Sequence, residues 1–277
     1  MDAVAAAVRE VSAGIVEPRF TALAVGDVRA KSPGELVTVA DEEAEAALTD
    51  RLGAILPGVP VVGEEACARD PRLLEALGAD RAWLVDPLDG TANFVASSPD
   101  WAIMVALVED GSTTASWIWQ PATSTMYTAQ RGAGAARNGE QLRISATVRP
   151  ERCRGAALRR FLGPDLLERI DTETVRRTLG VLGPGRYCAG VDYPLLVEGG
   201  QEFILFWRTL PWDHAPGLLL LSEAGGTSRR PDGSAYQVAD TGGCGLLAAT
   251  DDETWNKVHA VLFGSTKGTY LAETTSL

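Results

Sequence analysis

Residues 83–94 carry two acidic side chains at a spacing suited to metal chemistry. The segment reads W-L-V-D-P-L-D-G-T-A-N-F, with Asp86 at the end of an apolar run and Asp89 three residues later. Because Pro87 enforces an extended turn, both carboxylates can face one point. Paired hard oxygen ligands of this kind suit Mg²⁺. The segment therefore predicts a cation site at the end of a buried strand.

An anion site is expected directly beside these carboxylates. Gly90 and Thr91 open a helix or turn whose free backbone N–H groups can bind an anion. A cation site next to a phosphate cradle is what phosphoryl chemistry requires. The alternative is an Asp-rich turn capped by Asn93, without any ligand.

Two further acidic groups strengthen the metal hypothesis. Glu64 and Glu65 end the preceding apolar run, and Asp213 lies in W-D-H-A-P-G at the start of an apolar helix. Adjacent like charges at a strand end are unfavourable unless a cation or a water-filled cleft receives them. Taken alone, the Glu pair also suits a solvated loop, and Asp213 also suits a helix cap.

Hydrophobic periodicity predicts the elements that position these acids. In the first half it predicts helices over the first 16 or so residues and from near Asp41 to Pro57, short strands at 59–62 and 82–85, and an antiparallel meander over 101–144. In the second half it predicts helices near 164–178, 188–198, 212–224 and 251–263, alternating with strands near 154–158, 202–206 and 245–249. The expected class is α/β (α+β), with an antiparallel half over 1–148, an α/β half over 149–264 and a loosely ordered tail over 265–277.

Composition limits the partners of this chain. Its 277 residues are 45% hydrophobic and 22% charged, which excludes collagen, coiled coil and wholesale disorder. The net charge of −12 would repel a nucleic-acid backbone or an anionic membrane, so neither is an expected partner. Small anionic compounds remain possible partners because a bound cation reverses the local field.

Cysteine usage and the N-terminus point to a cytoplasmic protein. Four cysteines without a C-x-x-C pair, and only two histidines, argue against a structural zinc site and favour reduced thiols in an interior. The sequence begins without a basic stretch, and no 18 apolar residues run together. We therefore expect neither a secretory signal nor a membrane span.

The order of these motifs resembles one known family. G-E-E, then W-L-V-D-P-L-D-G-T-A-N-F, then W-D-H-A-P-G followed by E-A-G-G is similar to the inositol monophosphatase family, metal-dependent phosphatases related to fructose-1,6-bisphosphatase. Upstream, K-S at residues 31–32 and L-V-T-V-A-D at residues 36–41 match the family's K-S…D-L-V-T-x-x-D. The resemblance covers about residues 31–264 and implies a layered αβαβα sandwich, commonly a homodimer.

The resemblance also implies a role for each acid. Glu64, Asp86 and the carbonyl of Leu88 would bind one Mg²⁺; Asp86, Asp89 and Asp213 would bind a second; and Glu64 would help to hold a weaker third. Two cations about 3.5–4 Å apart can stabilise both the entering and the leaving oxygen of a displacement. Inhibition by Li⁺ is an associated expectation.

The remaining implied roles concern water and phosphate. Thr91, hydrogen-bonded to Asp41, would orient and deprotonate the attacking water, with Glu64 beside them at the catalytic centre. The N–H groups of Gly90 and Thr91 would bind phosphate oxygens, and Asp213 would also face the substrate. The substrate would be a small phosphorylated metabolite.

The sequence departs from the family's inositol-specific members at the leaving-group pocket. Those members carry a Glu six residues before the Trp of the W-D motif, where this chain has Phe206, and residues 190–194 replace a run of small residues. Inositol 1-phosphate is therefore expected to be a poor substrate, and an aromatic wall would favour a nucleoside or an imidazole-bearing alcohol. Alternatively, Phe206 packs inward as the last core residue of its strand.

Two rival functions and several side chains remain open. A bisphosphatase acting on fructose 1,6-bisphosphate or 3′-phosphoadenosine 5′-phosphate needs a second cationic pocket, for which Arg186 and Arg208 are the candidates. A non-catalytic binding module predicts the loss of a metal carboxylate. For His214 a packing or substrate-edge role is favoured over leaving-group chemistry. Lys31 either touches ligands at the site or is a plain surface lysine, and pairs such as Arg159-Arg160 are expected to be solvated.

Overall fold

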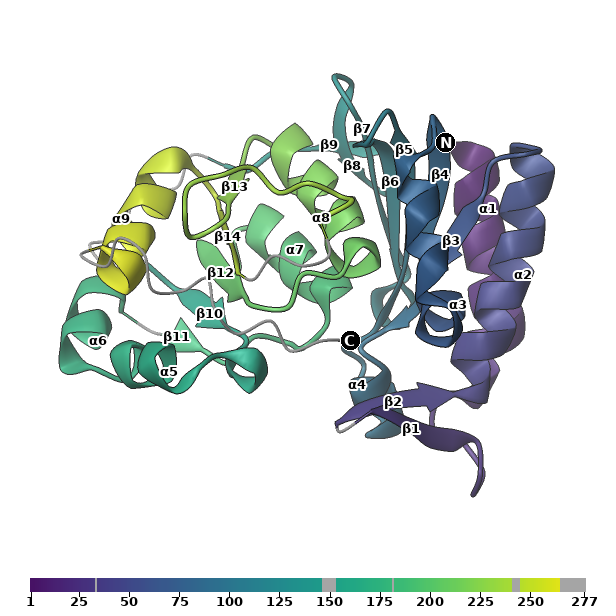
Figure 1. Ribbon diagram of the computed structural model, residues 1–277, viewed down its shortest axis with the longest axis horizontal. Helices are drawn as coiled ribbons and strands as arrows, with labels where there is room; N and C mark the ends of the chain where they lie inside the picture. The colour runs from purple at the N-terminus through teal and green to yellow at the C-terminus, as the bar shows by residue number, and fades with distance from the viewer. Residues whose placement is uncertain (33, 146–152, 181, 241–244, 265–277) are drawn as a thin grey trace.

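Two large β-sheets, separated and flanked by helices, and a small two-stranded sheet make up the described part of the molecule (Figure 1). The computed structural model describes residues 1–32, 34–145, 153–180, 182–240 and 245–264. Five layers follow one another in Figure 1. They are α1 (Asp2–Val11) with α2 (Val39–Ile55), a seven-stranded sheet, α7 (Ala189–Val197) with α8 (Pro211–Glu223), a five-stranded sheet, and an outer layer of α5 (Pro164–Ile170), α6 (Glu173–Leu179) and α9 (Asp252–Phe263). The expected αβαβα sandwich is confirmed. The expected boundary near residue 148 and the tail over 265–277 lie outside the described residues.

The seven-stranded sheet brings the two acidic strand ends together. Its strands, in spatial order, are β3 (Val61–Gly63), β4 (Arg81–Asp89), β5 (Ala102–Glu109), β6 (Ser112–Gln120), β7 (Thr125–Gln130), β8 (Gly134–Arg137) and β9 (Glu140–Leu142). The meander from β5 onward is antiparallel, as predicted. β3 and β4 instead run parallel, joined by α3 (Glu64–Arg69) and a 3₁₀ helix (Pro71–Gly78). Parallel strands end at the same edge, so Glu64 and Asp86 become neighbours.

Two helices cover the outer face of this sheet. α1 (Asp2–Val11) continues into a π-helical turn (Ser12–Val16) and a short 3₁₀ turn (Glu17–Arg19), so the predicted first helix is irregular after Val11. α2 (Val39–Ile55) begins two residues before Asp41, because Thr38 and Asp41 form a reciprocal capping box at its start. Apolar side chains of both helices pack against Trp83 and Trp117.

The second sheet has five strands. Its strands, in spatial order, are β11 (Leu182–Gly183), β10 (Gly155–Ala157), β12 (Phe203–Phe206), β14 (Leu246–Ala249) and β13 (Thr227–Arg229). Its helices are α5 (Pro164–Ile170), α6 (Glu173–Leu179), α7 (Ala189–Val197), α8 (Pro211–Glu223) and α9 (Asp252–Phe263). The single helix predicted at 164–178 is two helices, because Thr172 caps a new one. No helix in the described part of the chain is long and apolar enough to cross a membrane.

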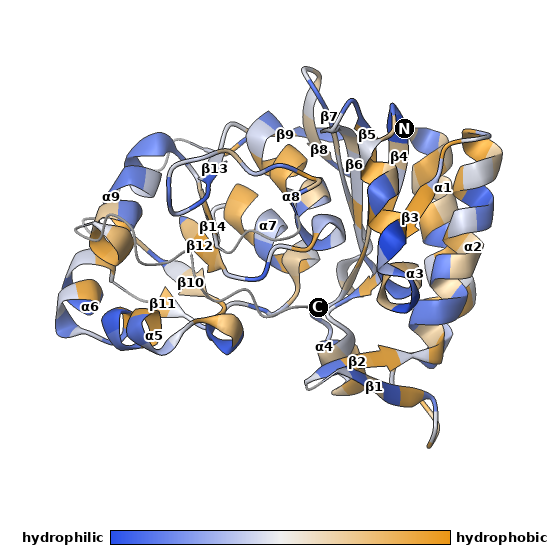
Figure 2. Cartoon of the chain, in the orientation of Figure 1, coloured by the Kyte–Doolittle hydropathy of each residue, from blue (hydrophilic) through white to orange (hydrophobic). Residues whose placement is uncertain are grey.

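Glycine allows close contact within the central helical layer. α7 and α8 are largely apolar and lie between the two sheets (Figure 2). A Cβ on Gly217 of α8 would overlap the ring of Tyr193 on α7, and one on Gly190 would lie 2.6 Å from Ala102 of the first sheet. Gly190 thereby lets the start of α7 approach the first sheet, and Gly217 lets α8 approach α7.

Candidate metal centre

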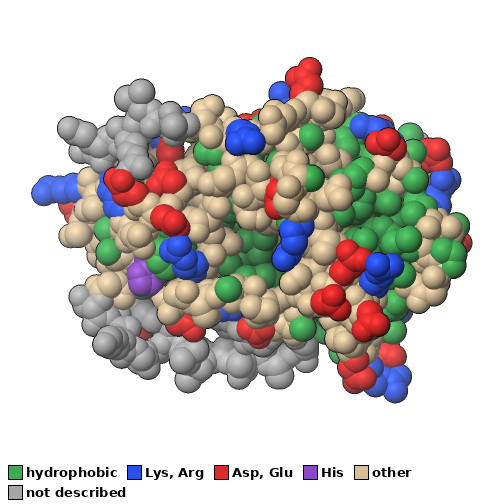
Figure 3. Space-filling model, turned by 90° about the horizontal axis from the view of Figure 1, so that it is seen from above, with side chains coloured by type: hydrophobic (Ala, Val, Ile, Leu, Met, Phe, Trp, Pro, Cys, Tyr) green, Lys and Arg blue, Asp and Glu red, His purple; other side chains and the backbone are tan. Residues whose placement is uncertain are grey.

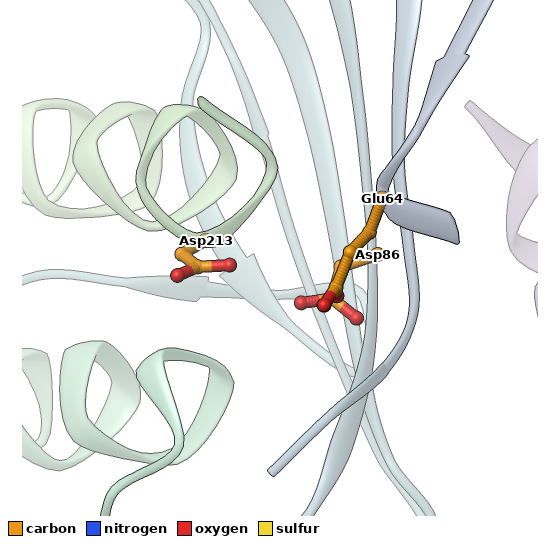
Figure 4. A group of neighbouring side chains, drawn as sticks. All are labelled: Glu64, Asp86 and Asp213. Atoms are coloured by element: carbon orange, nitrogen blue, oxygen red, sulfur yellow. The ribbon is translucent and has the colours of Figure 1, made fainter. Parts of the chain in front are cut away.

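Three carboxylates converge where the two halves of the fold meet (Figure 4). Oxygen atoms of Glu64, Asp86 and Asp213 all lie within 4.8 Å of one another. Glu64 begins α3 directly after β3, Asp86 lies in β4, and Asp213 reaches across from the first turn of α8. Residues almost 150 positions apart in the sequence thus form one acidic cluster.

Asp213 does not cap its helix. The expectation of a capping role is wrong, because α8 begins at Pro211 with Leu210 as the N-cap residue and without a side-chain cap hydrogen bond. Asp213 is the third helical residue, and its carboxylate faces Glu64 and Asp86 across the junction. Negative charge in the first turn still suits the helix dipole.

A buried acid on α2 fixes the position of Glu64. Glu45 is 4% exposed, and its carboxylate accepts hydrogen bonds from the N–H groups of Glu65 and Ala66, both at 2.7 Å. A Cβ on Gly63 would overlap this carboxylate, so the glycine lets the strand end approach α2. Glu45 belongs to none of the motifs that predict the site; its only signal in the sequence is an acid on the inward face of α2.

Lys31 neutralises part of the acidic edge. Its Nζ atom lies 2.6 Å from carboxylate oxygens of both Glu64 and Glu65. Burial alone would lower the pKa of Lys31, but these two ion pairs hold that pKa above its usual value. Lys31 therefore belongs to the site, and the plain surface alternative is wrong.

The electrostatics of the cluster favour a bound cation. Burial raises the pKa values of Asp86 and Asp213 well above their ordinary range, and the neighbouring carboxylates, Glu64 and Asp89, raise both further. Clustered carboxylates in a dry site must either take up protons or bind a cation. Hard oxygen donors are the ligands that Mg²⁺ and Ca²⁺ prefer, so the donor set fits a divalent metal.

Asp89 lies in the same pocket but outside the tight group of three. Its Oδ2 atom accepts hydrogen bonds from the N–H of Gly190 at 2.6 Å and from the thiol of Cys188 at 3.1 Å. Burial raises the pKa of Asp89 to about 6, against the opposing effect of these hydrogen bonds. Asp89 thus ties β4 to the start of α7, and Cys188, to which no role was assigned from the sequence, contributes to this link.

Thr91 and Asp41 form the pair that the resemblance implies. The Thr91 hydroxyl lies 3.0 Å from Asp41 Oδ1 and 3.0 Å from the Leu88 carbonyl oxygen. The other carboxylate oxygen of Asp41 accepts hydrogen bonds from the Thr38 N–H and hydroxyl. Burial raises the pKa of Asp41 to about 6. The hydroxyl is therefore held between two fixed acceptors at the pocket wall.

Gly90 lets the chain turn tightly beside the acids. It has φ +84°, in the left-handed region, and precedes the short helix α4 (Thr91–Val95). A Cβ at this position would lie 2.8 Å from the carbonyl oxygen of Asp100 and 3.1 Å from Cys188 Cβ. A side chain at residue 90 would therefore displace Thr91.

The acids line a pocket of about 380 Å³ at the junction. Phe206 lines it but is 2% exposed, stacked on Tyr193 with ring centroids 5.0 Å apart, so it packs inward as the alternative expected. His214 is held between the Tyr193 hydroxyl at 2.9 Å and the Arg208 carbonyl at 3.0 Å. Burial lowers the pKa of His214 to about 4, which leaves it neutral in a structural role. Of the two candidate cations, Arg208 lines the pocket, whereas Arg186 pairs with Asp100 outside the lining.

Comparison with known proteins gives a consistent result. The sequence profile of the inositol monophosphatase family matches residues 1–263. A Thermotoga maritima protein named fructose-1,6-bisphosphatase/inositol-1-monophosphatase is 32% identical over 194 residues, which are 69% of this chain and 70% of the relative. A Vibrio cholerae protein named Nus factor SuhB is 30% identical over 207 residues, 70% of this chain and 72% of the relative. The crystal structure of the extragenic suppressor protein suhB from Bartonella henselae shares the fold, with a TM-score of 0.80, 24% identity, and coverage of 96% of this chain and 99% of that chain.

Proposed function

This chain belongs to the inositol monophosphatase family, and we propose that it is a Mg²⁺-dependent phosphatase that hydrolyses a small phosphorylated metabolite. One observation carries the proposal. Oxygen atoms of Glu64, Asp86 and Asp213 lie within 4.8 Å of one another in a pocket that the Thr91 hydroxyl also lines. This arrangement unites a divalent cation site with a group able to orient water.

The carboxylates would share two or three Mg²⁺ ions. Glu64, Asp86 and the Leu88 carbonyl would hold one, and Asp86, Asp89 and Asp213 would hold another, with a weaker third at Glu64. The Leu88 carbonyl oxygen lies 3.0 Å from the Thr91 hydroxyl and has two lone pairs, so it can act as a ligand while Thr91 donates its one proton to Asp41. Bound Mg²⁺ would supply charge neutralisation at the phosphate and a lowered pKa for water.

The polar groups of the chain would orient the reactants. The Thr91 hydroxyl would accept a proton from the attacking water and donate its own to Asp41 Oδ1, 3.0 Å away. A carboxylate whose pKa is near 6 is well matched to receive a proton near neutral pH. The N–H groups of Gly90 and Thr91 would bind phosphate oxygens at the pocket floor.

Inositol 1-phosphate should be a poor substrate. Phe206 offers no hydrogen bond to a ring hydroxyl, and a hydroxyl left without a partner costs about 1–3 kcal/mol. Since Tyr193 already stacks on Phe206, the ring would form a fixed apolar floor and not a mobile stacking platform. The leaving group must then be recognised by other residues of the pocket.

A bisphosphatase is a second candidate because Arg208 lines the pocket. A non-catalytic module is less well supported: a relative is named a Nus factor, yet Glu64, Asp86, Asp89 and Asp213 are all present and line this pocket. We also propose a cytoplasmic homodimer that binds neither nucleic acid nor membrane. The expectation that it does not bind nucleic acid or membrane is supported by Figure 3. On the face shown there, the basic side chains of the described residues are dispersed among acids and form no stripe.

The test is phosphate release from a panel of phosphorylated metabolites. Protein stripped with a chelator should be inactive, Mg²⁺ should restore turnover, and Li⁺ should inhibit it. Asp86→Asn should stay inactive at every Mg²⁺ concentration. Full activity in excess chelator, or no hydrolysis of any compound with Mg²⁺, would contradict the proposal.

A further inference from the structure

Two guanidinium groups and one phenyl ring form a wall of the pocket. The Cζ atoms of Arg160 and Arg208 lie 5.1 Å and 4.8 Å from the ring centroid of Phe161. Arg160 and Phe161 belong to a 3₁₀ turn after β10, and Arg208 lies between β12 and α8. All three line the pocket that contains Glu64 and Asp213. Arg160 is exposed, as expected of a solvated basic pair, and it also lines the pocket.

The β1–β2 hairpin holds this wall in place. β1 (Val28–Ser32) and β2 (Glu35–Thr38) belong to the first half of the chain. Arg160 donates a hydrogen bond to the Gly34 carbonyl, and Arg208 forms an ion pair with Glu35. Gly34 has φ +82°, and a Cβ there would overlap the Arg160 guanidinium, so glycine permits the approach. Both guanidiniums thus have a defined position before any ligand binds.

Most hydrogen-bond donors of the wall remain available. A guanidinium has five N–H donors. Within the described residues, Arg160 contacts one neutral carbonyl and Arg208 pairs with one carboxylate, so the group formed with Glu35 carries a formal charge of +1. The charge of Arg208 also acts on Asp213, where it opposes the rise in the pKa of that carboxyl. Phe161 is 37% exposed, so it offers support to both arginines at a surface open to ligand.

We propose that Arg160 and Arg208 bind a second anionic group, a phosphate or a carboxylate, on the leaving group of the substrate. The inference rests on the proposed function and names its substrate class. The acidic cluster with its cations would take the reacting phosphate, and the wall would take the other end of the molecule. Guanidinium matches phosphate and carboxylate oxygens in a two-point geometry, and stacking on a ring lowers the entropy lost on binding. Phosphorylated compounds with a neutral leaving group lack this contact.

Pairs of compounds that differ by one anionic group test the proposal. Glucose 1-phosphate is compared with glucose 1,6-bisphosphate, and glycerol 2-phosphate with 2-phosphoglycerate, by kcat/KM and product analysis in Mg²⁺. The doubly anionic member of at least one pair should be preferred about tenfold or more, as expected for charge-assisted hydrogen bonds. The two pairs separate phosphate from carboxylate as the second anion.

Single substitutions assign the preference to the wall. Arg160→Gln and Arg208→Gln should each reduce the preference about tenfold, chiefly through a higher KM for the doubly anionic compound. Arg159→Gln is the matched control, because Arg159 lies in the same turn but pairs with Asp171 and does not line the pocket. It should keep the wild-type preference.

Three results would overturn the inference while leaving the phosphatase intact. The first is equal kcat/KM within both pairs, and the second is a preference for the doubly anionic compound that survives Arg160→Gln. The third is a preference for adenosine 5′-monophosphate over ribose 5-phosphate that is abolished by Phe161→Leu but not by Arg160→Gln. The last would assign the wall to a planar ring.

The anion site can be tested by binding even if the protein hydrolyses none of these compounds. If no compound is hydrolysed, the proposed function is wrong, and the same pairs can be titrated into the wild-type protein by calorimetry. A Kd about tenfold lower for the doubly anionic compound, lost in Arg160→Gln, would support the anion site. Equal or undetectable binding would overturn it.

Discussion

Replacing Asp86 by Asn should separate the stability that the fold loses to repulsion within the acidic cluster from the role of that cluster in metal binding. Asp86 is 1% exposed, and its carboxylate lies within 4.8 Å of those of Glu64 and Asp213. At an effective dielectric constant of about 20, two unit charges at that distance repel by about 3 kcal/mol. Asn keeps the oxygen that accepts the Leu88 N–H at 3.0 Å, so the substitution removes the charge and retains this contact.

We expect Asp86→Asn to raise the free energy of unfolding of the metal-free protein by about 1–3 kcal/mol, less than the full repulsion because partial protonation already relieves it. Burial and the neighbouring carboxylates raise the pKa of Asp86 in the folded state. The ionised carboxylate therefore destabilises the fold at high pH, and this effect is relieved as the pH falls through the folded-state pKa. The gain from the substitution should be largest at alkaline pH and shrink on acidification.

Thermal unfolding in chelator and across a Mg²⁺ titration measures both effects. Each kcal/mol corresponds to a shift of about 2–4 °C in Tm for a chain of this size. Wild-type protein should gain Tm with Mg²⁺ and Asp86→Asn should gain far less, whereas Asp192→Asn, at a buried carboxylate outside the cluster, should respond as wild type does. A lower Tm for Asp86→Asn in chelator, or an equal Mg²⁺ response in both proteins, would refute the reasoning.

Three further substitutions probe single contacts. Thr91→Ala should lower kcat by about 10²–10⁴ with little change in KM, and Thr91→Ser should restore most of it; a loss confined to KM would assign Thr91 to binding. His214→Gln should be less stable than wild type at pH 7, with the difference narrowing by about 2 kcal/mol at pH 5 in denaturant titrations. The sign follows because the His214 pKa falls from 6.5 to about 4 on folding, so wild type loses stability below pH 6.5; a constant difference would contradict it. Gly90→Ala should cost about 1–3 kcal/mol of stability and impair turnover, since φ is +84° there; unchanged Tm and kcat would show that the turn tolerates a side chain.

Alternation of apolar residues and turn motifs predicted those parts of the fold that depend on neighbouring residues in the sequence. The meander was predictable because alternating apolar residues are interrupted by Asp110-Gly111 and Asn138-Gly139, and all four adopt positive φ. Asp86 and Asp89, at the end of β4, were recognisable because they fall within one short motif. The β1–β2 hairpin escaped detection because its five-residue and four-residue strands are mostly exposed or half-buried and lack a clear alternation.

Contacts between distant segments could not be predicted from such patterns. Glu45 supports α3 from a helix some 20 residues earlier, and Cys188 bonds Asp89 from 99 residues away. Arg160 meets Gly34 across 126 positions. Asp213 was located by its motif, yet its orientation depends on how α8 lies against the first sheet, which no local propensity specifies. These contacts and the orientation of Asp213 are determined by how distant elements pack together.

The acidic cluster belongs to neither half of the molecule alone. Asp86 lies in the first sheet and Glu64 begins α3 directly after a strand of that sheet, whereas Asp213 lies in α8 of the helical layer between the two sheets. An ion bound by all three would act as a reversible cross-link between positions 64 and 213, and each tenfold rise in free metal above its Kd would add about 1.4 kcal/mol to the association of the halves. Susceptibility to proteolysis at the junction would then report the metal supply, so that the lifetime of the protein, as well as its rate of turnover, would depend on the cation.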